Sequence, residues 1–423
     1  MSATSAAESV ETVFRIESAR IIAGVARIVR DVGIAEEIAQ DAVVAALERW
    51  PESGVPENPG AWLMATAKHR AIDLVRRREA YARKLAEVGR ALEDQPPAEP
   101  PDVDDIDDDL LRLIFTACHP VLSAEARVAL TLRLLGGLTT REIARAFLVA
   151  EPTVAQRIVR AKRTLARAGV AFEAPHGTDR KVRLDSVLEV LYLVFNEGYS
   201  ATSGGDLVRP GLCEDALRLV RVLAGLMPEE TEVHGLAALL EFQASRTAAR
   251  TGPDGAPVLL AEQNRAKWNR LLINRGFASL RRAGKGPYSL QAAIAACHAG
   301  AVRYADTDWA VIAVLYDRLL EVLPSPVVAL NRAVAVSKAR GPAAGLALVD
   351  QLADAPALRG YHLLAGVRAD LLEALGRADE AAVEFHRAAS LTGNTRERDL
   401  LLGRASSAGA GGGASADPLE RPV

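Results

Sequence analysis

The sequence predicts an all-α protein with two small helical domains, an acidic linker between them, and a large helical domain with tetratricopeptide-like character. Aromatic residues make up only 4% of the 423 residues, and apolar residues mostly recur at spacings of three and four. The hydrophobic fraction of 49% is enough to fill several cores. Because the net charge is only -3, affinity for nucleic acid has to come from local basic patches.

Residues 10–90 are predicted to form the first helical domain. A helix is expected from about Ala35 to Trp50, because one of its faces is apolar and is made of Ile38, Ala42, either Ala45 or Ala46, and Leu47. The opposite face has no Lys or Arg four residues further on and carries Glu36, Glu37, Gln40 and Asp41. This acidic face is therefore either solvated or a docking surface for a basic partner.

A second helix of this domain is expected after a loop of residues 51–59, which contains three prolines, a glycine and an asparagine. It is predicted to begin near Gly60 and to turn one apolar face inward, made of Leu63, Ala67, Ala71 and Leu74. Its outward face is basic and includes Lys68, His69, Arg76 and Arg77. An acidic helix followed by a basic one suits a module that contacts a basic protein on one side and DNA on the other.

An acidic linker is predicted over residues 91–109. Residues 93–109 hold nine acids, four prolines and no Lys or Arg. Such a composition resists packing and extends by charge repulsion.

The second domain, residues 110–172, contains a predicted helix-turn-helix from Leu138 to Leu165, with residues 148–150 as its turn. Pro152 is tolerated because the first turn of a helix has no amide partner to lose. One face of the second helix is apolar (Val154, Ile158, Ala161 and Leu165) and another is polar (Gln156, Arg160, Arg163 and Arg167). Residues 133–168 carry eight Arg or Lys against two acids. The second helix is therefore predicted to recognise DNA, the alternative being a solvated basic face on an ordinary helical hairpin.

The third predicted domain, residues 180–404, follows a break at residues 175–177 and is rich in Ala and Leu. Gly341 and Gly376 lie 35 residues apart, and each precedes an alanine-rich amphipathic segment. This offset is close to the tetratricopeptide period of about 34 residues. Residues 405–423 are too poor in apolar side chains to order, so a disordered tail is expected.

Composition and motif content also limit which chemical functions the sequence can support. Cys118, Cys213 and Cys297 form no CxxC pair, which suits a reducing compartment and argues against a disulfide framework. Cys118 and His119 are adjacent, but two such residues do not make a zinc site, and no metal or cofactor is expected. No leader-like start or membrane-length apolar run stands out, so a cytoplasmic location is expected. The chain has no P-loop, HExxH, GxSxG or dinucleotide motif, and is not expected to be an enzyme.

Three runs of residues share the order and spacing of a known family. Residues 36–41 read EEIAQD, residues 62–78 read WLMATAKHRAIDLVRRR, and residues 142–165 run from Glu-Ile-Ala through Thr-Val to Arg-Ala-Lys-Arg. The first two resemble segments of region two, and the third resembles the region-four motif, in RNA polymerase sigma factors of the extracytoplasmic-function type. Residues 195–200 and 286–291 resemble segments of the long C-terminal helical extension found in one sigma subgroup.

The resemblance implies a sigma factor that binds the polymerase core and directs promoter-specific initiation without covalent chemistry. It implies contacts with the flap and with the clamp helices of the largest subunit, the latter through Glu36, Glu37, Gln40 and Asp41. It assigns -10 promoter DNA to the loop before Trp62 and to Asn58, Trp62, Lys68, His69, Arg76 and Arg77. It assigns -35 promoter DNA to Thr153, Gln156, Arg157, Arg160 and Arg163.

Four positions depart from the family pattern. Leu148 and Pro152 stand where the family usually has glycines, Ala155 where it often has Lys, and His69 where it often has Asn. The promoter sequence therefore does not transfer from relatives.

Other functions stay open at this point. One is a helix-turn-helix regulator with a tetratricopeptide-like sensor domain that acts without polymerase. Another is an enzyme in the third domain, built on polar residues such as Asn196, Glu197 and His298, although such residues are more typical of helix caps and satisfied cores. Residues 196–199 and 288–291 also suggest a groove for a regulatory protein or peptide. The extension is expected to modulate activity, with a sign that the sequence does not give.

Overall fold

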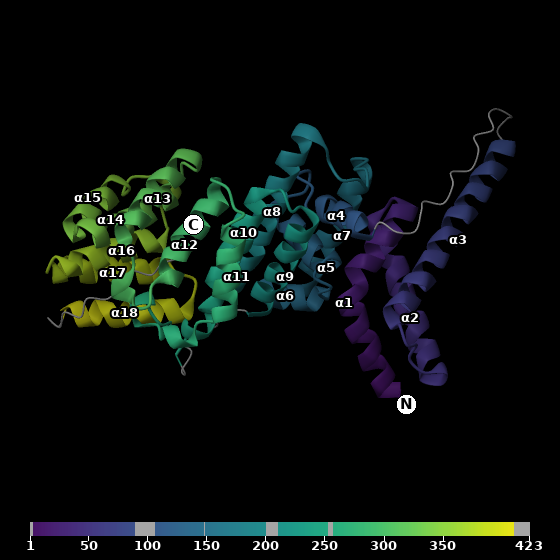
Figure 1. Cartoon of the computed structure of the whole chain (residues 1–423), viewed down its shortest axis with the longest axis horizontal. Helices are drawn as coiled ribbons and strands as arrows, with labels where there is room; N and C mark the ends of the chain where they lie inside the picture. Colours follow the sequence, from purple (N-terminus) through teal and green to yellow (C-terminus); the bar gives the residue numbers. More distant parts are fainter. Residues whose placement is uncertain (1–2, 89–105, 148, 200–209, 253–256, 410–423) are drawn as a thin grey trace. The chain divides into compact units, whose positions relative to one another are not determined.

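The computed structural model describes residues 3–88, 106–147, 149–199, 210–252 and 257–409 (Figure 1). These residues form α-helices joined by turns and short 3-10 segments, and they hold no β-strand beyond an isolated bridge between Thr251 and Pro257. The all-α prediction is confirmed. The chain divides into two compact units, residues 1–191 and residues 192–423, which we call the N-terminal and C-terminal units.

The N-terminal unit begins with three helices that pack on one another: α1 (Ala3–Val29), α2 (Val32–Ser53) and α3 (Pro59–Val88). Helix α2 starts three residues earlier than predicted, because the Asp31 side chain accepts hydrogen bonds from the amides of Gly33 and Ile34. It continues through Pro51 and ends before Gly54, whose φ is 81°.

The inward face of α2 was only partly predicted. Ile38 and Ala42 are buried as expected, but Leu47 is 43% exposed, so its assignment to the core was wrong. Ala45 and Ala46, the alternatives predicted for this face, are both buried, and so is Trp50, which was not predicted there. Since Trp50 is among the largest fully buried side chains of the described chain, it anchors this part of the core.

Helix α3 starts at Pro59, and the side-chain oxygen of Asn58 accepts a hydrogen bond from the amide of Ala61. Its predicted inward residues Leu63, Ala67 and Ala71 are fully buried, whereas Leu74 is only half-buried. The loop before it is shorter than predicted, because α2 runs on to Ser53.

Four helices follow: α4 (Ile106–Ala117), α5 (Ala124–Leu134), α6 (Thr140–Phe147) and α7 (Glu151–Arg167). The last four residues of the predicted linker are therefore helical, while residues 89–105, with most of its acids, lie outside the described residues. Asp109 is buried and lies 3.2 Å from Arg27 Nε of α1 and 3.1 Å from Arg112 Nη1. Pairing with two guanidinium groups explains why this one acid of the segment can be buried.

Helix α8 (Gly177–Tyr199) belongs to both units, because the division after Leu191 falls inside it. Its first half packs on α4 and α5. Arg183 Nη2 donates to the carbonyl of Phe115 at 3.3 Å, Ser186 Oγ donates to the carbonyl of Cys118 at 2.6 Å, and Arg127 Nη1 lies 2.9 Å from Glu189 Oε2. The predicted break at residues 175–177 is thus where α8 starts, and not where the compact unit ends.

The C-terminal unit continues with helices that pack mainly on their sequence neighbours. They are α9 (Pro210–Leu226), α10 (Thr231–Ser245), α11 (Arg270–Leu280), α12 (Pro287–Gly300), α13 (Trp309–Val322), α14 (Pro326–Arg340), α15 (Pro342–Gln351), α16 (His362–Ala374), α17 (Ala378–Leu391) and α18 (Thr395–Gly409). Gly341 and Gly376 have φ values of 98° and 75° and sit in the turns of the α14/α15 and α16/α17 hairpins. Each glycine precedes a helix, as the predicted repeat requires.

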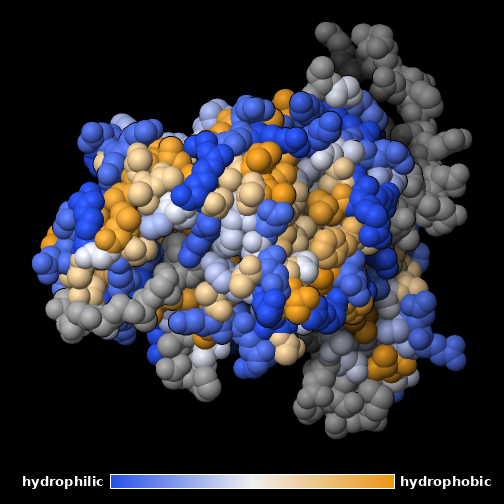
Figure 2. Space-filling model, turned by 60° about the vertical axis from the view of Figure 1, so that its left-hand side comes forward, coloured by the Kyte–Doolittle hydropathy of each residue, from blue (hydrophilic) through white to orange (hydrophobic). Residues whose placement is uncertain are grey.

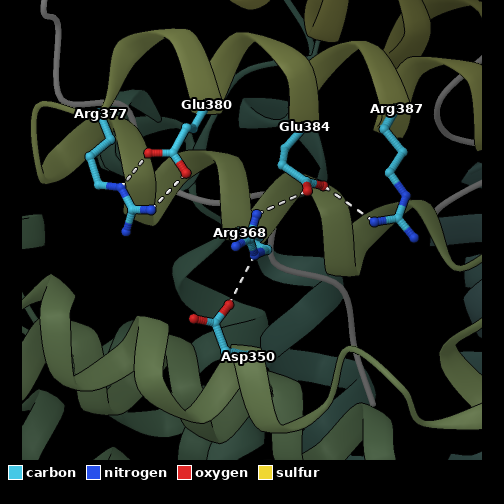
Figure 3. Close-up of polar contacts among 6 residues, drawn as sticks. All are labelled: Asp350, Arg368, Arg377, Glu380, Glu384 and Arg387. Atoms are coloured by element: carbon cyan, nitrogen blue, oxygen red, sulfur yellow. Dashed lines mark hydrogen bonds and ion pairs between the residues drawn. The ribbon is translucent and has the colours of Figure 1, made fainter.

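Charged side chains connect neighbouring helices of this stack (Figure 3). Arg368 of α16 bridges Asp350 of α15, at 2.9 Å, and Glu384 of α17, at 3.0 Å.

Figure 2 shows hydrophilic residues interspersed with apolar ones over one face of the molecule. Residues 405–409 belong to α18, so the prediction of disorder was wrong for them, and the rest of the predicted tail, residues 410–423, lies outside the described residues.

The residues suggested to line a groove are largely packed between helices. Tyr199 is fully buried, and Ser289 and Gln291 are buried as well. Glu232 of α10 accepts hydrogen bonds from the amides of Tyr288 and Ser289 and thereby caps α12. The motif at residues 286–291 therefore has a structural role in joining α10 to α12.

Candidate nucleic-acid interface

Helix α7 has two faces, as its sequence predicted. The apolar face, made of Val154, Ile158, Ala161 and Leu165, is buried against α5 and α6. The polar face, made of Gln156, Arg160, Arg163 and Arg167, is exposed. A helix fixed on one side and basic on the other can enter a DNA groove without unfolding any part of the domain.

The helices before α7 hold it in a helix-turn-helix. Thr139 and Glu142 form a capping box at the start of α6: the Glu142 carboxylate accepts from the Thr139 amide at 2.7 Å, and Thr139 Oγ1 accepts from the Glu142 amide at 3.1 Å. Pro152 lies in the first turn of α7, where the helix tolerates it. Residue 148 of the predicted turn lies outside the described residues.

The five predicted -35 residues differ in accessibility. Thr153, Gln156, Arg160 and Arg163 are exposed. Arg157 is half-buried. The pKa of the Glu125 carboxyl in α5 is lowered mainly by hydrogen bonds at the start of that helix, and the nearby positive charge of Arg157 lowers it further. The outward face of α7 thus contains four of the five predicted residues, with Arg157 at its edge.

The predicted -10 residues lie along α3 and the loop before it. His69, Arg76 and Arg77 are exposed, while Lys68 is half-buried. Asn58 is exposed, but its side-chain oxygen is occupied in capping α3. The fully exposed basic groups of the predicted set therefore lie in the middle part of α3.

Trp62, the aromatic member of that set, is half-buried rather than free at the surface. Its ring packs edge to face on Trp50, with ring centroids 5.6 Å apart. The core of the unit therefore fixes the orientation of this side chain.

The residues of the predicted polymerase-docking face of α2 also differ in accessibility. Glu37, Gln40 and Asp41 are exposed, and Asp41 lies 3.7 Å from Arg70 of α3. Glu36 is buried instead, and its side chain pairs with Arg133 of α5 and Lys162 of α7. Both partners are distant in the sequence, so no local pattern around Glu36 could have indicated them.

Comparisons with known proteins agree with this arrangement. A family model described as Sigma-70 region 2 matches residues 14–81, and one described as Sigma-70, region 4 matches residues 112–165. The ECF RNA polymerase sigma factor SigK of Mycobacterium sp. (strain KMS) is 33% identical over 128 residues, which cover 28% of this chain and 62% of that protein. The chain belongs to the sigma factors of the extracytoplasmic-function type.

The similarity of this sigma factor to known proteins continues past the sigma regions into its C-terminal extension. An uncharacterized protein of Rhizobium meliloti (strain 1021) is 46% identical over 380 residues, covering 88% of this chain and 89% of that protein. A family of unknown function matches residues 183–284, which start within α8. No solved structure matches the chain significantly.

Family membership favours sigma factor function among the broad functions that the sequence left open. Sigma factors are non-enzymatic factors of transcription initiation, and RNA polymerase core and promoter DNA are the partners of the family. Helices α1–α3 fall largely within region two, and α4–α7 within region four. None of the helices in the described ranges is both long enough and apolar enough to traverse a lipid bilayer.

Proposed function

We propose that this sigma factor docks on core polymerase through the exposed side of α2, contacts the -10 element through α3, and reads the -35 element through α7. The exposed basic face of α7 carries the proposal, because it is the part of the predicted interface that combines accessibility, positive charge and a rigid support. Glu37, Gln40 and Asp41 remain accessible to a basic coiled coil of the polymerase.

Replacing Arg160 by Ala should weaken binding of the holoenzyme to its promoter by about 1–3 kcal/mol, or about 5- to 150-fold. Arg160 is exposed in the middle of α7, where a side chain can reach base edges in the major groove. Promoters are first selected by in vitro transcription with core polymerase from a random-sequence library. Binding is then measured at fixed salt on the selected promoter and on a version with a scrambled -35 element.

Arg167→Ala is the matched control, because Arg167 is exposed in the last turn of the same helix. We expect it to weaken binding to both DNA molecules by a similar and smaller factor. Equal affinity of the unaltered protein for promoter and scrambled DNA would contradict -35 recognition by α7. Failure to bind core polymerase at all would favour the independent regulator.

We further propose that the C-terminal extension modulates the sigma regions. The first half of α8 supports this proposal, because Arg183, Ser186 and Glu189 contact α4 and α5 of region four and the helix then continues into the C-terminal unit.

A chain that ends after Leu191 tests the modulation, because it keeps the contacts of α8 with region four. Its run-off transcription with core polymerase is compared with that of the full chain. A several-fold higher yield means that the extension inhibits, and a several-fold lower yield means that it activates. Equal yields at all sigma concentrations would contradict modulation. Ending the chain after Gly177 is the informative comparison, since it also removes the Arg183 and Ser186 contacts.

A further inference from the structure

A three-residue ionic cluster joins region two to region four. Arg133 Nε of α5 donates to Glu36 Oε1 at 2.6 Å, and Lys162 Nζ of α7 pairs with Glu36 Oε2. Gln40 Nε2 donates to Oε1 of the same carboxylate at 3.0 Å. The Glu36 side chain is only 7% exposed, so both cations are needed to compensate a carboxylate removed from water.

The cluster is tied into the helix-turn-helix itself. Arg133 also donates to the carbonyl of Leu138, at 3.2 Å, in the loop that leads to α6. Lys162 lies on α7 between two members of the proposed DNA face, Arg160 and Arg163. The helix that is proposed to read DNA and the helix that is proposed to dock on polymerase therefore share one buried contact.

The stem of Lys162 lies near Gly33, at the start of α2. A Cβ placed on Gly33, at the start of α2, would lie 3.4 Å from Lys162 Cδ and 3.8 Å from Lys162 Cβ. A side chain introduced at Gly33 would therefore contact the stem of Lys162. A polymerase helix cannot reach Glu36 while α5 and α7 occupy this position.

We propose that region four covers part of the polymerase-docking surface in the free protein and that the Glu36–Arg133–Lys162 cluster holds this closed state. Binding of core polymerase requires the cluster to open, which frees Glu36 for the polymerase and Lys162 for DNA. The closed state lowers the apparent affinity for core by the fraction of molecules that are open. This inference rests on the proposed docking role of α2.

A disulfide between the two helices tests the closed state in the full chain. In the Gly33→Cys, Lys162→Cys variant the two Cβ atoms are placed 3.8 Å apart, which matches the usual spacing of about 3.8 Å in disulfides. Burial raises the pKa of the Cys118 thiol to about 11 and that of Cys213 to about 12, so neither competes well for oxidation at pH 8.

The oxidised variant should bind core polymerase about tenfold or more weakly than the same protein after reduction with dithiothreitol. The two single cysteine variants should show no such dependence on reduction. Two results would overturn the proposal: full core binding by the oxidised protein, or a folded variant that does not form the disulfide under oxidising conditions.

Lys162→Gln provides an independent test that leaves every proposed polymerase contact in place. Loss of one of the two cations destabilises the closed state, and we expect about fivefold or greater tightening of core binding measured without DNA. Arg163→Gln is the control, because Arg163 is the next residue of α7 and is exposed. Equal affinities of the Lys162→Gln variant and the unaltered protein would overturn the proposal.

The failure of this inference can be told apart from failure of the docking role of α2. Glu37→Ala and Asp41→Ala alter exposed residues of the docking face that do not belong to the cluster. If they leave core binding unchanged, the docking role of α2 is wrong. If they weaken core binding while the disulfide and Lys162→Gln have no effect, α2 docks as proposed but the closed state does not exist.

Discussion

Replacing Trp50 by Ala should lower the free energy of unfolding of the N-terminal unit by about 3–5 kcal/mol. The indole is 1% exposed and lies in the core that α2 shares with α1 and α3. Removing it takes away buried apolar area and leaves a cavity that helices fixed on both sides cannot fill. Urea denaturation followed by hydrogen exchange in peptides from α1 and α3 separates this unit from the rest of the chain.

Leu47→Ala is the control for this substitution. Leu47 lies one turn before Trp50 on the same helix but is 43% exposed, so its removal should cost well under about 1 kcal/mol. A comparable loss for both variants would mean that the sequence-based assignment of Leu47 to the core was right after all.

Trp50 also connects stability with the promoter contact proposed for Trp62, because the Trp62 ring packs edge to face against it. Without Trp50 the Trp62 ring loses the surface that orients it. We therefore expect the Trp50→Ala variant to open promoter DNA poorly at temperatures where it is still folded, measured by permanganate reactivity of the melted strand.

The faces of α7 could be predicted from the sequence because its apolar residues are large and evenly spaced. Val154, Ile158 and Leu165 define a single buried stripe on a helix whose other positions are mostly polar, charged or small, Val159 being the exception. The stripe of α2 is ambiguous in comparison. Its buried positions are mostly alanines, so the larger apolar residue Leu47 was added to the predicted face, although Leu47 is exposed and Trp50 is buried.

The role of Glu36 could not be predicted from the sequence. Its acidic neighbours are exposed, and one local pattern describes all four residues of that face equally well. Arg133 is 97 residues away, and only the packing of region four beside region two brings it close. Contacts of this kind depend on tertiary structure, which periodicity and composition do not encode locally.

At the end of the C-terminal unit, residues that were predicted to be disordered are helical and packed. Residues 405–409 have little apolar character, which predicted a disordered tail, yet Ala405 and Ala408 are buried. Small residues allow α18 to approach α17 closely, so a helix with low average hydrophobicity still packs. Arg404, the residue just before them, pairs with two carboxylates of α16.

Arg404→Met should lower the free energy of unfolding of the C-terminal unit by about 3–5 kcal/mol. Arg404 Nη2 lies 2.6 Å from Glu373 Oε2, its Nη1 pairs with Asp370, and the guanidinium stacks 4.3 Å from the Phe385 ring centre. Without the cation, two poorly exposed carboxylates of α16 are left close together. Methionine keeps a long apolar side chain over Phe385, so the loss reports on charge compensation rather than on packing. Thermal or urea unfolding monitored by hydrogen exchange in α16 and α17 measures it.

Arg377→Ala is the matched control, because Arg377 pairs with Glu380 at 2.6 Å but both side chains are largely exposed (Figure 3). Solvent screening makes such a pair nearly neutral for stability, and we expect no measurable change. Equal stability of Arg404→Met and the unaltered protein would mean that α18 is not an integral part of the stack. If Arg404→Met loosens α16–α18 and also changes run-off transcription, while Arg377→Ala does neither, then the far end of the extension is coupled to the sigma regions and not merely attached to them.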